Sequence, residues 1–327
     1  MTSETNRQVL HVPAREIPIP ASVSPAAQTI LAMPRRAAPP YPALDDIDGW
    51  RRYVAAMNAY MLAALGARAA QTAADVEEVD AGGVPAFDVR PSSVRKDDDG
   101  VYLDIHGGAF IVGGGECCRA EAVCLAADLG VRVWSVDYRA PPDHPFPAPL
   151  DDCLTAYRAL LTERAPQHIV IGGASAGATL TAALVLRARD EGLPLPAGVA
   201  LHTPGLDLTH AGDSILANRG LDAVLPDDMS SIARLYAGGH DLRHPYLSPI
   251  YGDFSRGFPP TFLSAGTRDL FLSDAARMHA ALRAADVDAE LHITEAASHG
   301  GFHGAPEEAH LNREVRKFLR KVWRRAG

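Results

Sequence analysis

The amino-acid sequence predicts an α/β fold with a mostly parallel sheet of about eight strands flanked by helices. Three strand-like segments follow one another between residues 76 and 105, and helices and strands alternate from there to the end of the chain. This alternation is typical of parallel strands joined by helical crossovers. Near the middle, at 169–180, a buried strand runs through a tight glycine turn into a helix of small residues. A length of 327 residues allows one large domain with an appendage, or two medium domains.

The first 70 residues are expected to lie apart from the sheet. Residues 1–44 are rich in proline, which breaks long helices, although a short helix can begin after Ser24 with Pro25 in its first turn. From 45 to 69, apolar residues recur every three or four positions, as in an amphipathic helix. They are Ile47, Trp50, Val54, Met57, Met61 and Leu65. This helix is expected to pack on the body of the protein; the alternative is that it lies over an active site and lines its pocket.

The remaining elements are assigned from apolar runs and turn residues. Strands are expected at 76–79, 84–89, 101–105, 131–136, 168–171, 199–201, 261–264 and 289–293. Helices are expected at 117–129, at 150–162, from the glycine turn to about 190, at 226–236, at 273–285 and at 306–320. A charged turn at 95–100 separates the second and third strands, and the rest of 205–258 is irregular.

Composition excludes several classes of protein. The formal net charge is −9 and no lysine- and arginine-rich run of the kind that tracks phosphates is present, so nucleic acid is not an expected partner. The four cysteines, Cys117, Cys118, Cys124 and Cys153, match no zinc or redox spacing and make no disulfide framework. The N-terminus lacks an apolar signal core and no apolar run reaches 18 residues. We therefore expect no membrane insertion and a cytoplasmic location.

The glycine turn holds a serine in the frame Gly173-Ala174-Ser175-Ala176-Gly177. This is the pattern of a nucleophile elbow, in which a strained strand-to-helix turn presents a serine hydroxyl above a sheet. Glycine is expected on both sides because a Cβ atom there would collide with the neighbouring strand or helix. The N-terminal amides of the following helix would point at negative charge that develops beside the serine. Small residues at this spacing also occur in ordinary turns, so the assignment depends on partners elsewhere in the chain.

A serine nucleophile needs a base to accept its proton and an acid to orient that base. In the chain order serine, acid, histidine, Asp269 follows the strand at 261–264, at the edge where such sheets bind ligands. Asp274 is the second candidate for the acid, although Ser273 or Asp274 is also expected to cap the helix that follows. His299 lies in a glycine-containing loop after the last strand and is the expected base.

Two further histidines lie close to His299 in the sequence. His292 alternates with apolar residues within its strand and is expected to be structural. His303 lies four residues after His299, and two histidines at that spacing on a helix can bind a metal ion. Glycines between them and the lack of a third ligand argue against this, so no metal site is expected.

Amides that stabilise a negatively charged oxygen are expected in the loop after the third strand. His106-Gly107-Gly108-Ala109 directly follows the strand at 101–105, which is the position of a His-Gly-Gly-Gly-type loop. The amides of Gly107, Gly108 and Ala109 are expected to act together with that of Ala176, the residue after the serine. A plain turn is the alternative interpretation of the two glycines.

Taken in order, these motifs resemble the hormone-sensitive-lipase branch of the α/β-hydrolases, bacterial esterase family IV, over residues 75–320. The resemblance rests on His106-Gly107-Gly108-Ala109-Phe110, Asp137-Tyr138-Arg139, the segment 145–152, the serine frame, Gly266-Thr267-Arg268-Asp269 and His299-Gly300. Three departures stand out. Ala109 replaces a third glycine and is expected to need only an ordinary backbone conformation, Ala174 replaces an aspartate before the serine, and 140–143 differs from the usual loop. The segments 248–251 and 266–270 are most similar to monoterpene ε-lactone hydrolase-like members.

The resemblance implies an α/β-hydrolase fold with an N-terminal helical cap at 1–70, a catalytic domain at 71–327 and a second cap insertion at about 205–240. It implies a serine hydrolase that acts on short- to medium-chain esters or lactones through an acyl-enzyme, needs no cofactor and can form a homodimer through the last strand near 289–293. An amide or peptide hydrolase with the same triad and a non-catalytic ligand receptor remain as alternatives. Trp50, Met57 and Leu206 are candidates to line the pocket, or equally to lie in the core.

Overall fold

The computed structural model describes residues 9–35, 39–95 and 98–324. Residues 1–8 and 36–38 of the expected cap segment, 96–97 of the charged turn and 325–327 at the chain end lie outside this description.

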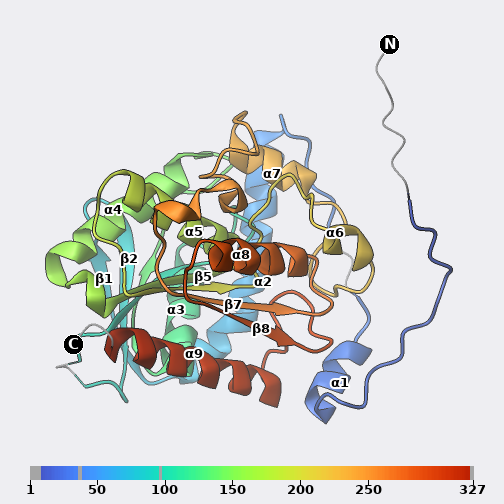
Figure 1. The fold of residues 1–327 in the computed structure, drawn as a ribbon, viewed down its shortest axis with the longest axis horizontal. Helices are drawn as coiled ribbons and strands as arrows, with labels where there is room; N and C mark the ends of the chain where they lie inside the picture. Colours follow the sequence, from blue (N-terminus) through green and yellow to red (C-terminus); the bar gives the residue numbers. More distant parts are fainter. Residues whose placement is uncertain (1–8, 36–38, 96–97, 325–327) are drawn as a thin grey trace.

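A single eight-stranded sheet runs through the centre of the protein (Figure 1). Its strands are β1 (Ala74–Asp80), β2 (Pro85–Pro91), β3 (Val101–Ile105), β4 (Arg132–Val136), β5 (Ile169–Ala174), β6 (Gly198–His202), β7 (Thr261–Gly266) and β8 (Ala289–Thr294). The spatial order is β1-β2-β4-β3-β5-β6-β7-β8. β2 is antiparallel to both β1 and β4, and every other neighbouring pair is parallel. The predicted fold class, a mostly parallel sheet of about eight strands flanked by helices, is confirmed.

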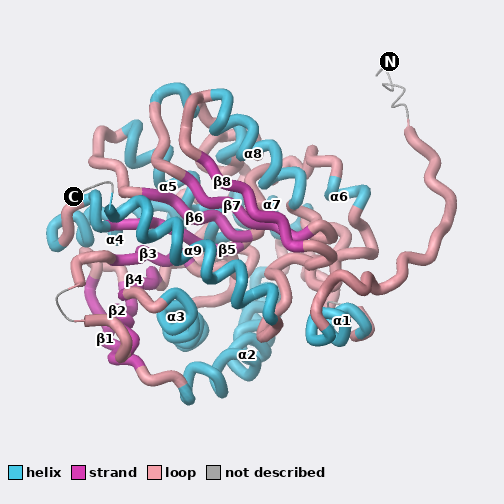
Figure 2. Tube along the Cα trace, turned by 60° about the horizontal axis from the view of Figure 1, so that its bottom comes forward, coloured by secondary structure: helices cyan, strands magenta, loops and turns pink. Residues whose placement is uncertain are grey.

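Helices cover both faces of the sheet, and α3 and α9 lie together on one of them (Figure 2). α4 (Ala148–Glu163), α5 (Ala176–Asp190) and α8 (Leu272–Ala284) contribute to one hydrophobic cluster, and α3 (Glu116–Leu129) and α9 (Pro306–Arg324) to another. Successive strand residues point to opposite faces. In β3, Leu103 and Ile105 therefore join the first cluster, whereas Tyr102 joins the second. Burial on both faces explains why these strands read as continuous apolar runs in the sequence.

The N-terminal segment packs on the body of the protein only in part. Residues 9–22 form no helix or strand and follow an extended path along its outside (Figure 1). α1 (Pro25–Ala32) begins as expected, since the Ser24 side chain accepts a hydrogen bond from the Ala27 amide at 3.2 Å. α2 (Ile47–Gln71) packs against α3, with Trp50 fully buried. The other apolar positions of α2 are half-buried or exposed, so its apolar stripe is shallower than the sequence suggests.

The irregular segment after β6 lies beside the carboxyl end of the sheet and contains α6 (Ser214–Ala217) and α7 (Ser230–Ala237). Three short 3₁₀ helices, at Pro166–His168, Pro249–Tyr251 and Phe254–Arg256, complete the described elements. The helix expected at 226–236 begins only at Ser230. The cause is local: the Asp228 carboxylate accepts the Ser230 amide at 2.8 Å, which closes a turn before the helix. No helix in the described parts of the chain is long and apolar enough to cross a membrane.

Candidate active site

Ser175 lies at the carboxyl end of β5, where the chain turns sharply into α5. Its φ of 55° is in a region that non-glycine residues rarely adopt, which is the strained geometry expected of a nucleophile elbow. A Cβ atom on Gly173 or on Gly177 would overlap the carbonyl oxygen of Ile105 in the adjacent strand. The sequence-based explanation for both glycines is thereby confirmed: only a hydrogen atom fits between the turn and β3.

Asp269 and His299 complete a chain of hydrogen bonds with Ser175. The Ser175 hydroxyl is 2.8 Å from His299 Nε2, and His299 Nδ1 is 3.2 Å from Asp269 Oδ1. Because a carboxylate accepts, Nδ1 carries the proton and Nε2 is free to accept the serine proton. The Asp269 side chain is fully buried and that of His299 nearly so. Three residues from three separate loops at the carboxyl edge of the sheet thus form one continuous relay.

The electrostatics around His299 favour its protonated form. Burial on its own lowers the pKa of an imidazole, and here it is outweighed by the charge of Asp269, its hydrogen bond and the charge of Asp222. The pKa of His299 is therefore raised above 6.5. A base with a raised pKa holds an abstracted proton more firmly, which suits proton transfer from a hydroxyl.

The loop between β7 and α8 differs from the predicted capping pattern. The residue at the N-cap position of α8 is Phe271, and no side chain caps the helix there. Asp269 Oδ1 instead accepts the Phe271 amide at 2.8 Å, in addition to its bond with His299. The expectation that Ser273 or Asp274 caps α8 is therefore wrong. Asp274, the second candidate for the acid, accepts the Asp207 amide at 3.0 Å and is not hydrogen-bonded to His299.

The loop after β3 lies against the serine turn. A Cβ atom built on Gly107 would come within 3.0 Å of the Ala174 carbonyl oxygen and 3.8 Å of Ser175 Cβ. Gly108 has φ 106°, and a Cβ atom there would overlap the Val112 carbonyl oxygen. Of the four residues expected to supply amides, Ala109 and Ala176 line the same cavity as Ser175. Ala176 is the first residue of α5, where a backbone N–H has no partner within the helix.

The conformation of Ala109 contradicts the sequence-based expectation. Its φ is 54°, in the left-handed region, so alanine is not in an ordinary backbone conformation at this position. Phe110 also has a positive φ, of 66°, and its ring stacks on that of Tyr236 at 3.9 Å. The whole loop follows a path that glycine would adopt more easily, and packing by Phe110 holds it there.

His106 anchors the base of this loop. Its Nδ1–H donates to the Gly107 carbonyl at 2.8 Å, and its ring stacks on Tyr138 at 4.1 Å. The Tyr138 hydroxyl in turn donates to the His106 carbonyl at 3.0 Å. In the same motif, Arg139 forms an ion pair with Asp152 at 2.7 Å. Tyr138 therefore packs against His106 at the start of the loop, Arg139 binds Asp152 of α4, and neither side chain lines the cavity.

One group of side chains in the described residues could in principle offer three ligands to a metal ion. Atoms of His106, Cys118 and Asp137 lie within 4.8 Å of one another. A thiol must lose its proton to bind a metal, and burial raises the pKa of the Cys118 thiol well above its usual range. The Cys118 sulfur also lies 3.2 Å from the Ser135 hydroxyl. The donor set fits packing beneath the loop better than it fits a metal centre.

The two remaining histidines have separate surroundings. His292 stacks on Phe262 at 4.4 Å within the sheet, in keeping with a structural role. His303 Nδ1 lies 3.0 Å from Glu308 Oε1, and the side chain is 80% exposed. His303 therefore pairs with a carboxylate of α9 at the surface.

Ser175 opens into a narrow apolar cavity of about 80 Å³. It is lined by Tyr41, Ala109, Phe110, Ser175, Ala176, Thr179, Gly205, Leu208, His210, Leu225, Pro226, Met229, Ile232, Ala233 and Phe271. Burial lowers the pKa of His210, so it faces the cavity as an uncharged group. Trp50, Met57 and Leu206 are absent from this lining, and Trp50 and Leu206 are core residues. None of the lining residues comes from α2. Tyr41, which precedes α2 and stacks on Trp50, lines the cavity instead.

Sequence reasoning missed one buried carboxylate next to the triad. Asp222, from the irregular segment between β6 and β7, is fully buried. Its Oδ2 accepts the amides of Leu270 and His299, at 3.0 and 3.3 Å. No motif or periodicity marks it, because it lies in a stretch without regular structure.

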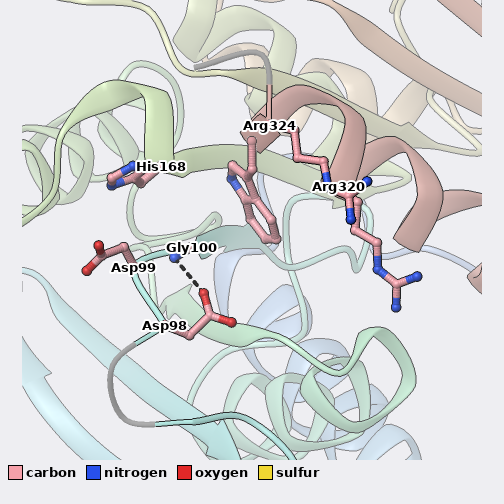
Figure 3. A pocket seen from close by; sticks show the side chains of 7 residues that line it. Asp98, Asp99, Gly100, His168, Arg320 and Arg324 are labelled. Carbon is pink, nitrogen blue, oxygen red and sulfur yellow. Dashed lines mark hydrogen bonds between the residues drawn. The ribbon is translucent and has the colours of Figure 1, made fainter. Parts of the chain in front are cut away.

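A second, more open cavity of about 290 Å³ lies at the amino ends of the strands. Figure 3 shows the side chains that line it. It is lined by Asp98, Asp99, Gly100, His168, Arg320, Trp323 and Arg324. Gly100 and His168 precede β3 and β5, whereas Ser175 follows β5. Since β5 has six residues, its two ends lie roughly 20 Å apart. This cavity therefore shares no residue with the triad.

Comparison with known proteins agrees with this geometry. The family model described as the alpha/beta hydrolase fold matches residues 102–303. An acetyl-hydrolase of Streptomyces hygroscopicus is 35% identical over 199 residues, which cover 60% of this chain and 65% of that protein. An esterase of Acinetobacter venetianus is 36% identical over 198 residues, which cover 57% of this chain and 62% of that protein. The matched part thus spans less than two thirds of either relative.

Solved structures resemble the chain over more of its length. One esterase crystal structure superposes with a TM-score of 0.86 at 37% identity and covers 95% of this chain and 98% of that one. An esterase from the bacterial hormone-sensitive lipase family superposes with a TM-score of 0.77 at 32% identity and covers 92% and 99%. The closer resemblance to monoterpene ε-lactone hydrolases finds no support among these proteins. The chain belongs to the α/β-hydrolase family and, within it, to the hormone-sensitive-lipase-like branch, bacterial family IV.

Proposed function

We propose that this protein is a serine hydrolase of carboxylic esters that works through an acyl-enzyme intermediate. The observation that supports it most is the relay from Ser175 through His299 to buried Asp269, with its serine end opening into a cavity. Relatives described as an acetyl-hydrolase and as esterases support the same reaction class. The acetyl-hydrolase and the Acinetobacter esterase are matched over only part of their length, so the activity of the whole protein is a proposal.

The mechanism follows from the positions of the atoms. As Ser175 Oγ attacks the ester carbonyl carbon, its proton passes to His299 Nε2, and Asp269 stabilises the imidazolium that forms. The C–O bond to the leaving alcohol then breaks, and the imidazolium gives its proton to the leaving oxygen. Water, deprotonated by the same histidine, attacks the acyl-serine and releases the carboxylic acid and the free serine. Each proton taken up by His299 is returned within the cycle.

The amides around Ser175 are suited to the negative oxygen of the tetrahedral intermediate. We assign this role to Gly107, Gly108, Ala109 and Ala176, the first three from the loop after β3 and the last from the start of α5. Removal of one such donor typically costs about 2.7–4 kcal/mol of barrier. The strained backbone of Ala109 is consistent with a loop held in a fixed orientation.

The cavity favours small apolar acyl groups. Its volume of about 80 Å³ is well below the roughly 300–1,000 Å³ of typical ligand pockets. Leu208, Met229 and Ile232 provide apolar walls, and no lysine, arginine or carboxylate side chain is among the described lining residues. Short-chain esters are therefore the proposed substrates, with medium chains and lactones fitting less readily unless the walls move.

Three further features are part of this proposal. The assignment of 1–70 and about 205–240 as a cap over the domain at 71–327 is supported by Tyr41, from the first segment, and by seven residues between 208 and 233, from the second, which line the cavity. The outer edge of β8, where Ile293 is 43% exposed, offers a surface for a homodimer. A cytoplasmic location is consistent with four free, buried cysteines.

The test compares linear p-nitrophenyl esters from acetate to decanoate with lactones and anilides of matched size. The proposal predicts the highest kcat/KM for acetate to butyrate, weak activity on lactones and little on anilides. Preference for the anilides would make the protein an amide hydrolase. No turnover of any substrate, together with no labelling by a fluorophosphonate probe, would favour a ligand receptor instead.

A further inference from the structure

We propose that Asp222 is a positioning residue that ties the loop of the catalytic base to the loop of the catalytic acid and places a second negative charge beside the base. The inference rests on the proposed function of the triad. Asp222 comes from the segment between β6 and β7, within the proposed cap insertion, so the cap would contribute directly to the geometry of catalysis.

The Asp222 carboxylate is bound by four backbone amides. Oδ1 accepts those of Val224 and Leu225 at 2.9 and 3.1 Å, which fixes the carboxylate within its own turn. Oδ2 accepts the amides of Leu270 and His299 at 3.0 and 3.3 Å. Leu270 directly follows the acid, Asp269. One oxygen atom therefore connects the two loops that carry the acid and the base.

Neighbouring side chains strengthen the same connection. The side-chain nitrogen Nδ2 of Asn218 donates to the backbone carbonyl oxygens of Asp269 and Thr267, at 2.8 and 3.2 Å. The Ser298 hydroxyl accepts the Ala223 amide at 3.0 Å. The segment from Asn218 to Ala223 is thus bonded to the acid loop on one side and the base loop on the other.

The carboxylate of Asp269 is hydrogen-bonded through only one of its two oxygens among the described residues. Asp269 Oδ1 accepts from both Phe271 and His299, whereas Oδ2 is buried without a hydrogen-bond partner among the described residues. Its orientation is therefore fixed through one oxygen and through the backbone that carries it. Asp222 and Asn218 hold that backbone at Leu270 and at Asp269.

The charge of Asp222 also acts on the base. Among the described residues, the charged groups that shift the pKa of His299 upward are Asp269 and Asp222, the first in the β7–α8 loop and the second in the insertion. The edge of the Phe271 ring faces the imidazole at 5.3 Å, and Ser175 is neutral. Loss of the Asp222 charge would leave Asp269 alone to stabilise the imidazolium.

An amide could not replace this carboxylate. An asparagine side chain at this position would offer one acceptor oxygen, and its NH₂ group would face two backbone N–H donors. Asp222→Asn therefore removes the charge and breaks two of the four hydrogen bonds from backbone amides. A displacement of the catalytic groups by about 1 Å can lower the rate about 100-fold.

The experiment compares Asp222→Asn with Asp213→Asn, which removes a charge from an exposed position of the same segment. Two rates are measured against pH: kcat/KM for p-nitrophenyl acetate, and labelling of Ser175 by a fluorophosphonate probe, which needs no natural substrate. Asp222→Asn is expected to lower both rates about 10- to 100-fold. It is also expected to move the acid limb of both profiles to lower pH, because the pKa of His299 falls. Asp213→Asn is expected to match the wild type in both.

A wild-type acid limb in a folded Asp222→Asn protein would overturn the proposal, whether or not its rate is reduced, because a merely structural role leaves that limb in place. If Asp222→Asn does not fold, Ser298→Ala loosens the same connection without exposing a buried charge. It should then lower kcat with a wild-type circular dichroism spectrum, and an unchanged kcat would contradict the proposal. Failure of the wild type to react with either reagent would refute the proposed function itself.

Discussion

His299 Nε2 lies 2.8 Å from Ser175 Oγ, although 124 residues separate the two in the chain. The sheet makes this contact, because β5, β7 and β8 end at the same edge and each delivers one member of the triad. The order of the strands in the sheet, and not their closeness in sequence, brings His299 to Ser175.

Asp269→Asn is expected to lower kcat about 10³- to 10⁴-fold, because an amide cannot hold His299 in the tautomer that leaves Nε2 free. Asp274→Asn is the matched control. Asp274 is a buried carboxyl five positions away whose pKa burial raises to about 7, and it is not hydrogen-bonded to His299. Its amide variant should retain kcat within a few-fold. Steady-state assays on both variants distinguish the two candidates for the acid, and a larger loss in Asp274→Asn would reverse the assignment.

The pH profile reports the protonation of His299. The base must be neutral to accept the serine proton, so kcat/KM rises with pH as the imidazolium loses its proton. Because the charges of Asp269 and Asp222 outweigh the effect of burial, the pKa of His299 is raised, and the midpoint of the acid limb should lie above 6.5. A profile of kcat/KM between pH 5 and 9 measures it. A midpoint below 6.5 would show that the effect of burial on the pKa of His299 outweighs the effect of the two carboxylates.

Ala109 is expected to tolerate glycine but not valine. Its φ of 54° is strained for a β-branched residue, so Ala109→Val should destabilise the fold by about 1–2 kcal/mol or more and lower kcat through movement of the loop. Ala109→Gly should stay within about 1 kcal/mol of the wild type, because relief of strain is offset by greater freedom of the unfolded chain. Thermal unfolding of both variants checks this. Equal stability of the valine variant would mean that the loop adopts an ordinary conformation.

Met229 is expected to limit the length of the acyl chain. It lines the cavity, so Met229→Ala should raise the ratio of kcat/KM for octanoate to that for acetate about 10-fold or more. Met278 is fully buried in the core and does not line the cavity, which makes Met278→Ala the control for a general loss of stability. Both variants should be less stable than the wild type. In Met278→Ala, the free energy of unfolding should fall by about 2–5 kcal/mol. A change of chain preference in Met278→Ala as well would exclude a local effect.

The parts of the site that follow local rules were predictable from sequence. The Ser175 turn needs glycine on both sides, and Asp269 and His299 each follow a strand, so residue type and order were enough to predict that these two side chains lie beside Ser175. Asp222 and Tyr41 were not predictable, because they lie in irregular or proline-rich segments whose positions are set by contacts with distant loops. Ala109 shows a different limit: alanine favours an ordinary conformation, but packing of Phe110 on Tyr236 imposes a positive φ.

The central claim is that Ser175 is the nucleophile that carries the acyl group. The most direct measurement is the mass of the protein and of its tryptic peptides after reaction with a fluorophosphonate probe, with Ser175→Ala treated in parallel. We expect one adduct per chain, located on Ser175, complete loss of p-nitrophenyl acetate hydrolysis in the labelled protein, and neither label nor activity in Ser175→Ala. An adduct on another residue, or turnover by Ser175→Ala at the wild-type rate, would contradict the account.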